Sequence, residues 1–407
     1  MTKKQVLQKP LDGIRIVEYG VFHAGPGGTA ILGDLGAEII KIENHLGDPE
    51  RYWTQVAGYD FSLKNKESIV FQISNRSKRS ICLDIKKTQG KAIFNQLVEK
   101  ADVFLTNLRP STKQKLELDY EDIARLNPQI VYAGVSGYGQ KGPMKDLGAF
   151  DPLGSAISGL MHVAGTPEPS LLHIGILDQA TAISVSHAIL TALLVRERQG
   201  IGQEVHVSLY STALWLQHMN LMFANAFAVN PCIPGDRSKH SPLRNRFQCK
   251  DGEWVISTHH PEEKYWATFC KVTKQEALLD DSRYTSAKGA PINFVELNAL
   301  FDQVLATKAS DEWMAIFLEH GLMFAKVQHI SDVQTDPQAL ANDYVVPFDH
   351  PLIGRINIPG YPVRFSASQV ETRKAGPELG AHTDEILQEI GYTEAEIDRF
   401  RNEKVIK

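Results

Sequence analysis

The sequence of 407 residues predicts an α/β protein, with a doubly wound, mainly parallel sheet in a large Rossmann-like domain and a smaller central α+β domain. Two observations predict this class. Short runs rich in β-branched residues alternate with helix-length segments over the first half of the chain. A stretch with proline, glycine and charge at residues 230–241 (NPCIPGDRSKHS) then interrupts the alternation. Since the chain is longer than one core usually serves, we expect more than one domain.

The first predicted unit has the order strand, loop, helix, strand. Residues 14–19 (IRIVEY) are typical of a strand, and residues 25–28 (GPGG) predict a tight loop after it. Residues 29–35 predict a compact helix closed by Gly36, and residues 38–43 (EIIKIE) predict a second strand.

The alternation continues along the chain. Strands are expected at residues 80–85, 103–106 and 130–136, with helices at residues 90–100 and 119–126. Strands separated by helices in this way imply a mainly parallel sheet that is covered on both faces.

A long helix is predicted from Asp178 to about Gln199, with Gly200 as a left-handed residue at its end. A strand at residues 204–209 and a second long helix at residues 212–228 follow.

Two changes of pattern predict the domain boundaries, one at residues 230–241 and one near residues 336–349. Between them, the sequence predicts a hairpin arm at 252–258 and helices at 262–272, 294–306 and 310–320. Strand-like alternation resumes at 355–358, and helices are expected from Thr383 and near 394–402. We therefore expect a large domain at 1–229, a small domain at 230–335, and a return to the large domain at 336–407.

Composition argues against several classes of protein. Lys and Arg total 43 against 48 Asp and Glu, a net charge of -5 that argues against nucleic-acid binding. The four cysteines form no C-x-x-C pair, so we expect neither a disulfide framework nor a zinc site. The N-terminus lacks a secretory pattern, and the apolar run at 180–195 is shorter than the ~20 residues of a membrane span. We expect a cytoplasmic protein with no membrane partner.

Three familiar site patterns fit poorly. Residues 137–142 (GYGQKG) match G-x-G-x-x-G, but Pro143 and Gly148 argue against the helix that would hold a dinucleotide pyrophosphate. His259 and His260 are adjacent and have no Cys or His cluster beside them, so no metal is expected. A serine hydrolase is not supported, because G-x-S-x-G does not occur.

Basic residues gather near the ends of two predicted strands. A solvated surface is the simpler interpretation of such a cluster. Because open α/β sheets bind ligands at strand ends, the cluster is also suited to a polyphosphate. Its members are Arg76, Lys78, Arg79, Lys86, Lys87, Arg109, Lys113 and Lys115.

Asp178 opens the long apolar helix, shortly after Gly175. The simpler interpretation is a helix N-cap, where Asp is favoured. The same position stabilises a charged carboxylate and offers N–H donors to an oxyanion formed beside it. An ionised carboxylate is also a nucleophile that needs no separate base.

Several segments, taken in order, resemble class III CoA-transferases, the family that includes formyl-CoA and crotonobetainyl-CoA transferases. The resemblance spans nearly the whole chain. It is carried by residues 35–43 (LGAEIIKIE), 75–86 (NRSKRSICLDIK), 101–110 (ADVFLTNLRP), 196–207 (RERQGIGQEVHV) and 380–387 (GAHTDEIL), among others.

The resemblance implies that Asp178 is the nucleophile of an enzyme that moves CoA from an acyl-CoA thioester to a free carboxylic acid. CoA is then a substrate and carrier, and no cofactor is bound permanently. An interlocked homodimer is implied as well. The implied CoA contacts are Phe22, His23, Leu83, Asp84, Ile85, Lys86, Asn107, Leu108, Arg109, Lys115, Gly148, Ala149, Phe150 and Asp151.

The chain departs from the family pattern at two positions and from the pattern of related racemases at a third. Asn44 and Lys115 stand where family members often carry Arg, so the phosphate contacts differ there. The α-methylacyl-CoA racemases of the same fold use a His before the aspartate that matches Asp151, and Phe150 stands here. Phe cannot carry a proton, which favours transfer over racemisation. An isomerase of the racemase type and a non-catalytic CoA-binding protein remain the alternatives.

The sequence does not identify the acyl group or the acceptor acid. Trp53, Trp215, Phe223 and Tyr265 are suited to line a pocket, but we expect most of them to pack in a core. The glycine-rich loop that shields the intermediate in formyl-CoA transferases is not evident between residues 227 and 254.

Overall fold

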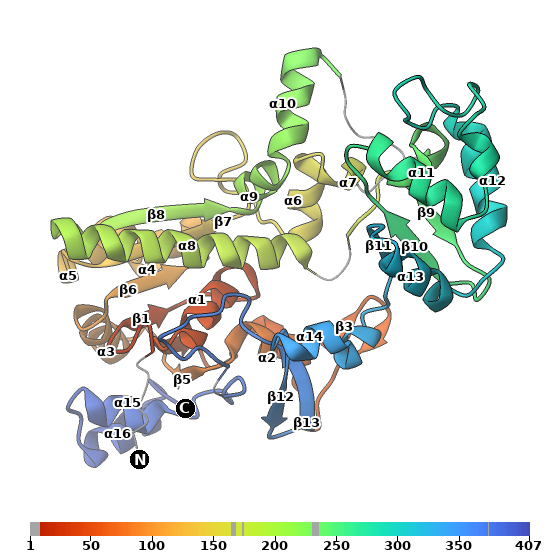
Figure 1. Cartoon of the computed structure of the whole chain (residues 1–407). Coiled ribbons are helices and arrows are strands. Elements are labelled where there is room, and N and C mark those ends of the chain that lie inside the picture. Colours follow the sequence, from red (N-terminus) through yellow and green to blue (C-terminus); the bar gives the residue numbers. More distant parts are fainter. Residues whose placement is uncertain (1–8, 164–167, 173–174, 230–235, 373) are drawn as a thin grey trace. The chain divides into compact units, whose positions relative to one another are not determined.

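The computed structural model describes residues 9–163, 168–172, 175–229, 236–372 and 374–407. The chain divides into two compact units, which are labelled by element in Figure 1. The large unit contains Met1–Cys232 and Leu340–Lys407, and the small unit contains Ile233–Ala339.

The large unit is built on a six-stranded parallel sheet with the order β5-β2-β1-β6-β7-β8. The strands are β1 (Arg15–Glu18), β2 (Glu38–Glu43), β5 (Lys78–Cys82), β6 (Val103–Thr106), β7 (Val131–Ser136) and β8 (Gln203–Ser208). The predicted α/β class with a mainly parallel sheet is confirmed. The strand order reverses between β1 and β6, and open α/β sheets bind ligands beyond the carboxyl ends of the strands at such a point.

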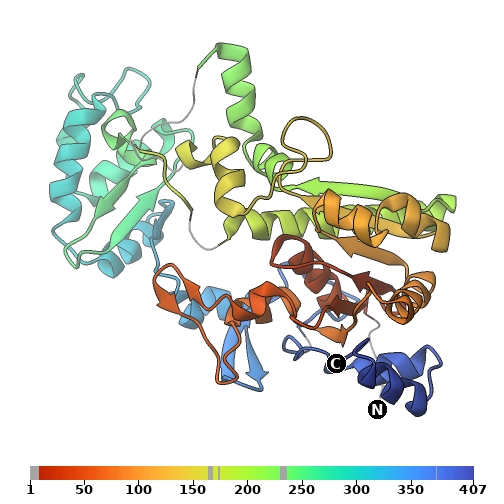
Figure 2. The same cartoon turned by 180° about the vertical axis from the view of Figure 1, so that it is seen from behind.

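Side chains of the sheet alternate between two hydrophobic cores. In β1, Ile16 belongs to one core and the next residue, Val17, belongs to the other, as the pleat of a strand requires. The core around Ile16 is covered by α1 (Ala24–Asp34) and α8 (Ile176–Gln199). Helix α8 runs along the sheet, as the two opposite views in Figures 1 and 2 show.

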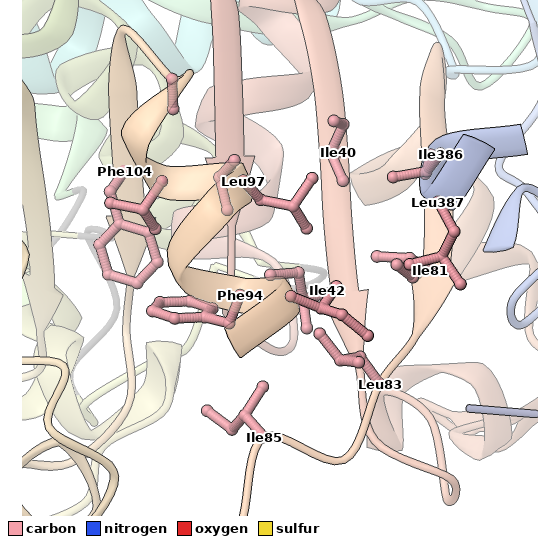
Figure 3. Close-up of a cluster of buried hydrophobic side chains, with 14 of the residues drawn as sticks. Ile40, Ile42, Ile81, Leu83, Ile85, Phe94, Leu97, Phe104, Ile386 and Leu387 are labelled. Carbon is pink, nitrogen blue, oxygen red and sulfur yellow. The ribbon is translucent and has the colours of Figure 1, made fainter. Parts of the chain in front are cut away.

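The other core joins distant parts of the chain. Phe94 and Leu97 of α3 (Thr88–Glu99) pack with Ile40 and Ile42 of β2, as Figure 3 shows. Ile386 and Leu387 of α15 (Thr383–Glu389) complete the same core from the C-terminal part. The large unit is therefore closed by residues that follow the small unit in sequence.

Residues 25–28, predicted as a loop, lie inside helix α1, so that prediction is wrong. A Cβ at Gly28 would lie 2.6 Å from Val185 Cγ1 of α8, and one at Gly27 would lie 3.0 Å from Ala182 Cβ. Pro26 is tolerated because it falls in the first turn of the helix. The glycines thus allow α1 and α8 to pack closely, and they do not form a turn.

Helix α8 has 24 residues and ends before Gly200, whose φ of 70° is the predicted left-handed conformation. By length and composition it is the one described helix that is apolar enough to cross a membrane. Its buried residues, which include Leu177, Val185 and Ile189, pack in the large unit. We interpret it as a core helix.

The helix predicted at residues 212–228 is two helices, α9 (Leu209–Leu216) and α10 (His218–Phe227), which meet at Gln217. No residue of α10 is buried, and Met219 and Phe227 are 68% and 70% exposed. Trp215, Phe223 and Trp53 are also exposed, so the expectation of core packing is wrong for these three aromatic residues. Tyr265 packs against the core of the small unit.

The described residues of the small unit combine a three-stranded antiparallel sheet with three helices of ten or more residues. Its strands are β9 (Arg246–Gln248), β10 (Trp254–Ser257) and β11 (Phe324–Lys326), and its helices are α11 (Glu263–Val272), α12 (Phe294–Leu305) and α13 (Ser310–Glu319). Its core is rich in aromatic rings. Phe269 lies with its ring centroid 4.6 Å from that of Phe301, and the rings of Trp313 and Phe317 stack at 5.4 Å.

The remaining elements connect or flank this framework. They are β3 (Gln55–Val56), β4 (Tyr59–Asp60), α2 (Ile69–Asn75), α4 (Pro110–Leu116), α5 (Tyr120–Leu126), α6 (Asp151–Ile157), α7 (Leu160–Val163), α14 (Pro337–Ala341), β12 (Val345–His350), β13 (Gly354–Pro359) and α16 (Glu394–Asn402).

Candidate active site

Asp178 lies in the first turn of α8 and is partly buried. The residue before the helix is Gly175, whose φ of 65° is a left-handed conformation that glycine adopts without strain. The chain therefore turns sharply into the helix. This turn places the Asp178 carboxyl group at the end of α8 that carries a partial positive charge.

A second carboxylate caps the helix at this point. Asp151, the first residue of α6, is 6% exposed and accepts hydrogen bonds from the N–H groups of Leu177 at 2.7 Å and Asp178 at 3.1 Å. Ser155 donates to its other oxygen at 3.3 Å. The interpretation of Asp178 as the N-cap is therefore wrong, because Asp151 satisfies these N–H groups from a different helix.

The two carboxylates differ in their environment. Burial, together with the nearby charge of Asp151, raises the pKa of Asp178 to about 7. The expectation that the helix start stabilises the charged form of Asp178 is thus corrected, since burial and the like charge of Asp151 favour the neutral form. With a pKa of about 7, Asp178 is present both as acid and as carboxylate near neutral pH.

His23 lies beside α8 and has both ring nitrogens engaged. Its Nδ1 atom is 2.7 Å from Ser74 Oγ of α2, and its Nε2 atom is 2.7 Å from Gln179 Oε1 of α8. Burial lowers the pKa of His23, so the ring is neutral. The predicted CoA contact at His23 is therefore limited to surfaces of the ring that these bonds leave open.

The loops after β1 and β6 are joined by the Asn107 side chain. It accepts from the N–H group of Val21 at 2.9 Å and donates to the Val21 carbonyl at 2.6 Å. The Arg109 guanidinium lies close to the loop before α6, because a Cβ at Gly148 would be 2.4 Å from Nη2. The structure thus brings together predicted contacts from three separate segments at one edge of the sheet.

Phe22 and Phe150 form an aromatic pair at the same edge, with ring centroids 5.1 Å apart, and Trp53 lies 6.3 Å from Phe22. Phe150 is 54% exposed and directly precedes Asp151. These rings offer an apolar surface next to the start of α6.

The predicted contacts after β5 divide into two kinds. The side chains of Leu83 and Ile85 are buried in the sheet core, at 0% and 5% exposure, so they can offer a ligand little more than backbone. Lys86 is exposed, and its N–H group donates to Asp84 at 3.1 Å. Lys115 is exposed on α4. Leu108 packs at the edge of the core, and Ala149 packs against Leu177 and Leu209.

Residues 11–383 match the family model of CoA-transferase family III. The chain belongs to CoA-transferase family III. This confirms the family and the class of enzyme that the sequence segments indicated, and such enzymes use CoA thioesters as substrates. Among the described residues, no group of three or more His, Cys, Asp or Glu is arranged to hold a metal ion.

Relatives of this family III CoA-transferase cover nearly its whole length. An acyl-CoA transferase of Fusarium pseudograminearum (strain CS3096) is 35% identical over 411 residues, 98% of this chain and 89% of that protein. Succinyl-CoA:glutarate CoA-transferase of Mus musculus is 33% identical over 410 residues, 98% of this chain and 91% of that protein. The crystal structure of a CaiB/BaiF family protein from Brucella suis has a TM-score of 0.81 at 26% identity and covers 94% of this chain and 100% of that chain.

In this CoA-transferase, much of the predicted basic cluster is occupied by internal ion pairs. Lys78 is buried and bonds Glu18 at 2.7 Å, Arg76 bonds Asp34 at 2.6 Å, and Arg79 bonds Glu38 at 2.5 Å. For these three residues, both interpretations of the basic cluster, a solvated surface and a phosphate site, are therefore wrong.

Sequence reasoning missed a buried charged cluster behind the site, formed by Glu18, Lys41, Asp48 and Lys78. Although burial opposes it, the two ammonium groups lower the pKa of Glu18 to about 2. Lys78 also donates to the Pro26 carbonyl at 2.8 Å, and Lys41 donates to the Gly20 carbonyl at 3.0 Å. The signal was present, because Glu18 ends one strand and Lys41 follows two isoleucines in the next, in a sheet whose strands are expected to be buried on both faces.

Proposed function

We propose that this CoA-transferase moves CoA from an acyl-CoA thioester to a free carboxylic acid through covalent acylation of Asp178. The observation that carries the proposal is the position of Asp178 at the start of α8, partly buried and with a pKa raised to about 7. A carboxylate in such a site is less stabilised by water than an exposed one and is a better nucleophile. The match of Asp178 to the catalytic aspartate of the family supports the same role.

The proposed reaction begins when a carboxylate oxygen of Asp178 attacks the thioester carbonyl carbon. The carbon–sulfur bond breaks, the CoA thiolate leaves with the electron pair, and an aspartyl anhydride forms. The thiolate then attacks the Asp178 carbonyl carbon and releases the donor acid as its carboxylate. This leaves an aspartyl-CoA thioester. The acceptor carboxylate repeats the two steps in reverse order, which restores Asp178 and releases the new acyl-CoA.

We propose that CoA lies along the carboxyl edge of the sheet. The contacts implied by the family resemblance come from the segments at residues 22–23, 83–86, 107–109 and 148–151, together with Lys115. Arg109, Lys86 and Lys115 supply the cationic groups that a phosphate-bearing carrier needs, since Asn44 supplies none.

A racemase-type isomerase is the second candidate, and no observation favours it. Such an enzyme needs a proton-transfer group on each side of the α-carbon. Phe150 stands at the position of the family's His, and both ring nitrogens of His23 are engaged. A protein that only binds CoA would not need a buried carboxylate at the helix start.

We further propose a homodimer in the cytoplasm. Helices α9 and α10 expose large apolar side chains, which include Trp215, Met219 and Phe227, and neighbouring exposed apolar side chains of this kind mark interaction sites. A second copy of the chain would cover it, and light scattering at micromolar concentration should give twice the monomer mass. The described cysteines are free and buried, as suits a reducing compartment.

The test is the intact mass of the protein after mixing with a panel of acyl-CoA donors, with trapping by hydroxylamine. We expect one modification, on Asp178, and none in the Asp178→Asn variant. Asp119→Asn, which alters a partly exposed carboxylate of the same unit at the start of α5, serves as the matched control and should label normally. A modification at another residue, or deuterium exchange at the α-carbon without transfer, contradicts the proposal.

A further inference from the structure

A chain of hydrogen-bonded side chains leads from a buried carboxyl group to the residue next to Asp178. Glu50 Oε1 lies 3.1 Å from Ser74 Oγ, which lies 2.7 Å from His23 Nδ1. On the other side of the ring, His23 Nε2 lies 2.7 Å from Gln179 Oε1. The four residues come from the 3-10 turn at Pro49–Tyr52, from α2, from the residue before α1, and from α8.

The chemistry of the groups fixes the direction of the protons along this chain. The amide oxygen of Gln179 can only accept, so the hydrogen of the neutral His23 ring is on Nε2. Nδ1 must then accept, and Ser74 uses its single hydrogen for it. With the Ser74 hydrogen directed at Nδ1, the contact of 3.1 Å between Ser74 Oγ and Glu50 Oε1 is a hydrogen bond only when Glu50 is a protonated acid that donates to Ser74.

The surroundings of Glu50 favour that protonated acid. Glu50 is fully buried, and its Oε2 atom has no partner among the described residues. Burial and the charge of Asp48 raise the pKa of Glu50 to about 8. The charged groups that act on the two ends of the chain are Asp48, Lys41 and Lys78 at Glu50, and Arg76, Lys78 and Asp151 at His23.

The helix start has few N–H groups left for a reaction intermediate. Asp151 takes the N–H groups of Leu177 and Asp178, and the Gly175 carbonyl takes that of Gln179 at 2.8 Å. The expectation that backbone N–H groups of this turn face a developing oxyanion is therefore poorly supported. Another donor is needed beside Asp178.

The Gln179 carboxamide is suited to this task. Its oxygen is held by His23, its nitrogen has no acceptor among the described residues, and the side chain is exposed. A hydrogen bond accepted at the oxygen of an amide also polarises its N–H groups and makes them better donors.

We propose that Gln179 is a catalytic residue of the transfer reaction, donating an N–H to the oxyanion that forms at the carbonyl carbon under attack beside Asp178, and that Glu50, Ser74 and His23 are positioning residues that hold its carboxamide. This inference rests on the proposed function. It assigns the reaction a donor that the chain itself supplies.

The test is a double-mutant cycle on the rate of Asp178 acylation, measured by rapid quench and intact mass. The probe is succinyl-CoA or, if that does not acylate the wild type, the best donor of a panel of short-chain acyl-CoA thioesters. Gln179→Leu should slow acylation about 100-fold to 1000-fold, as the loss of one oxyanion donor does. Ser74→Ala should slow acylation about 10-fold. The double variant should acylate as slowly as Gln179→Leu and no more slowly, because Ser74 acts only through Gln179.

A matched control lies on the same helix. Ser184 donates only to the Ala180 carbonyl, so Ser184→Ala should acylate at the wild-type rate. Losses that multiply in the double variant, or a Gln179→Leu variant with a normal rate, overturn the inference.

A pH profile separates this role from a structural one. Ionisation of Glu50 above pH about 8 makes it an acceptor only, so Ser74 turns toward it and the proton on the His23 ring moves to Nδ1. The lone pair of Nε2 then faces the Gln179 oxygen, and the acylation rate of the wild type should fall. Glu50→Gln has an amide that donates at every pH and should keep its rate. An alkaline fall of the same size in both proteins overturns the inference.

The outcomes also separate this inference from the proposed function. A wild type that is never labelled at Asp178 overturns both. Normal labelling of Asp178 with no effect of Gln179→Leu overturns the inference alone.

Discussion

The large and small units bury very different side chains. Beneath the candidate active site, the large unit buries the charged cluster of Glu18, Lys41, Asp48 and Lys78. The small unit buries an aromatic core, in which Phe269 contacts the rings of Phe301, Phe317 and Phe324. Aromatic rings can pack in more than one arrangement, offset-stacked or edge-to-face, whereas a buried ion pair offsets its desolvation cost only with good geometry.

The difference follows the location of the chemistry. Lys41 donates to the carbonyl group of Gly20 and Lys78 donates to that of Pro26, residues that lie on either side of His23 in the sequence. Asp48 accepts from the Phe22 N–H group at 3.1 Å. The charged cluster therefore holds the turn between β1 and α1 at defined bond lengths. No such demand acts on the aromatic core, which has only to be filled.

The largest effect is expected from breaking the charged cluster. Lys78→Met leaves Glu18 and Asn75 without a partner that they have in the fold, and removing one member of a buried pair costs about 3–5 kcal/mol of unfolding free energy. Urea unfolding should show this loss. Lys100→Met, at an exposed position, should change stability by less than about 0.5 kcal/mol. A loss below about 1 kcal/mol for Lys78→Met would show that the cluster is not needed for stability.

A smaller effect is expected from a shape change in the aromatic core. Phe269→Leu keeps an apolar side chain and should cost about 1–2 kcal/mol, less than the about 3–5 kcal/mol of Phe269→Ala. The acylation rate of the folded enzyme should stay near the wild-type value, since Phe269 lies in the core of the small unit. Unfolding midpoints and rates on the same samples check both statements. Equal costs for Leu and Ala would contradict the view that this core needs only to be filled.

The smallest effect is a shift in pH dependence. In the proposed reaction Asp178 attacks as a carboxylate, so the acylation rate should rise with pH through about 7, before the fall that the ionisation of Glu50 is expected to cause above pH about 8. Asp151→Asn keeps an oxygen that accepts from the helix N–H groups but removes the charge, which should move this rise down by about one pH unit. Glu197→Gln, at the far end of α8, should leave it in place. An unchanged profile for Asp151→Asn would mean that burial alone raises the pKa of Asp178.

Much of the fold could be predicted because its strands are short, apolar and separated by helices. The pattern IRIVEY or EIIKIE is decided locally, and so is the αL glycine at the end of α8. The GPGG segment could not be interpreted locally, because its conformation depends on Val185 and Ala182 of α8, over 150 residues later. The break at Gln217 has no proline or glycine to announce it.

The candidate site was less predictable. Asp178 was identified by its resemblance to a family, since local rules favoured an N-cap. The residue that caps the helix, Asp151, belongs to another helix and lies 27 residues before Asp178 in the sequence. A contact over this separation leaves no periodic pattern in the sequence. Contacts such as His23 with Ser74 and Gln179 depend on three elements meeting in space.

The way in which the second half of the chain returns to the large unit has a consequence for synthesis on the ribosome. Ile386 and Leu387 complete the core beneath β2 and β5, and Leu83 pairs with Ile406. During translation the small unit leaves the exit tunnel before these residues exist. The core of the first half of the chain therefore stays incomplete, with apolar side chains exposed, until the C-terminal residues are synthesised. During this time chaperones would bind this part of the chain.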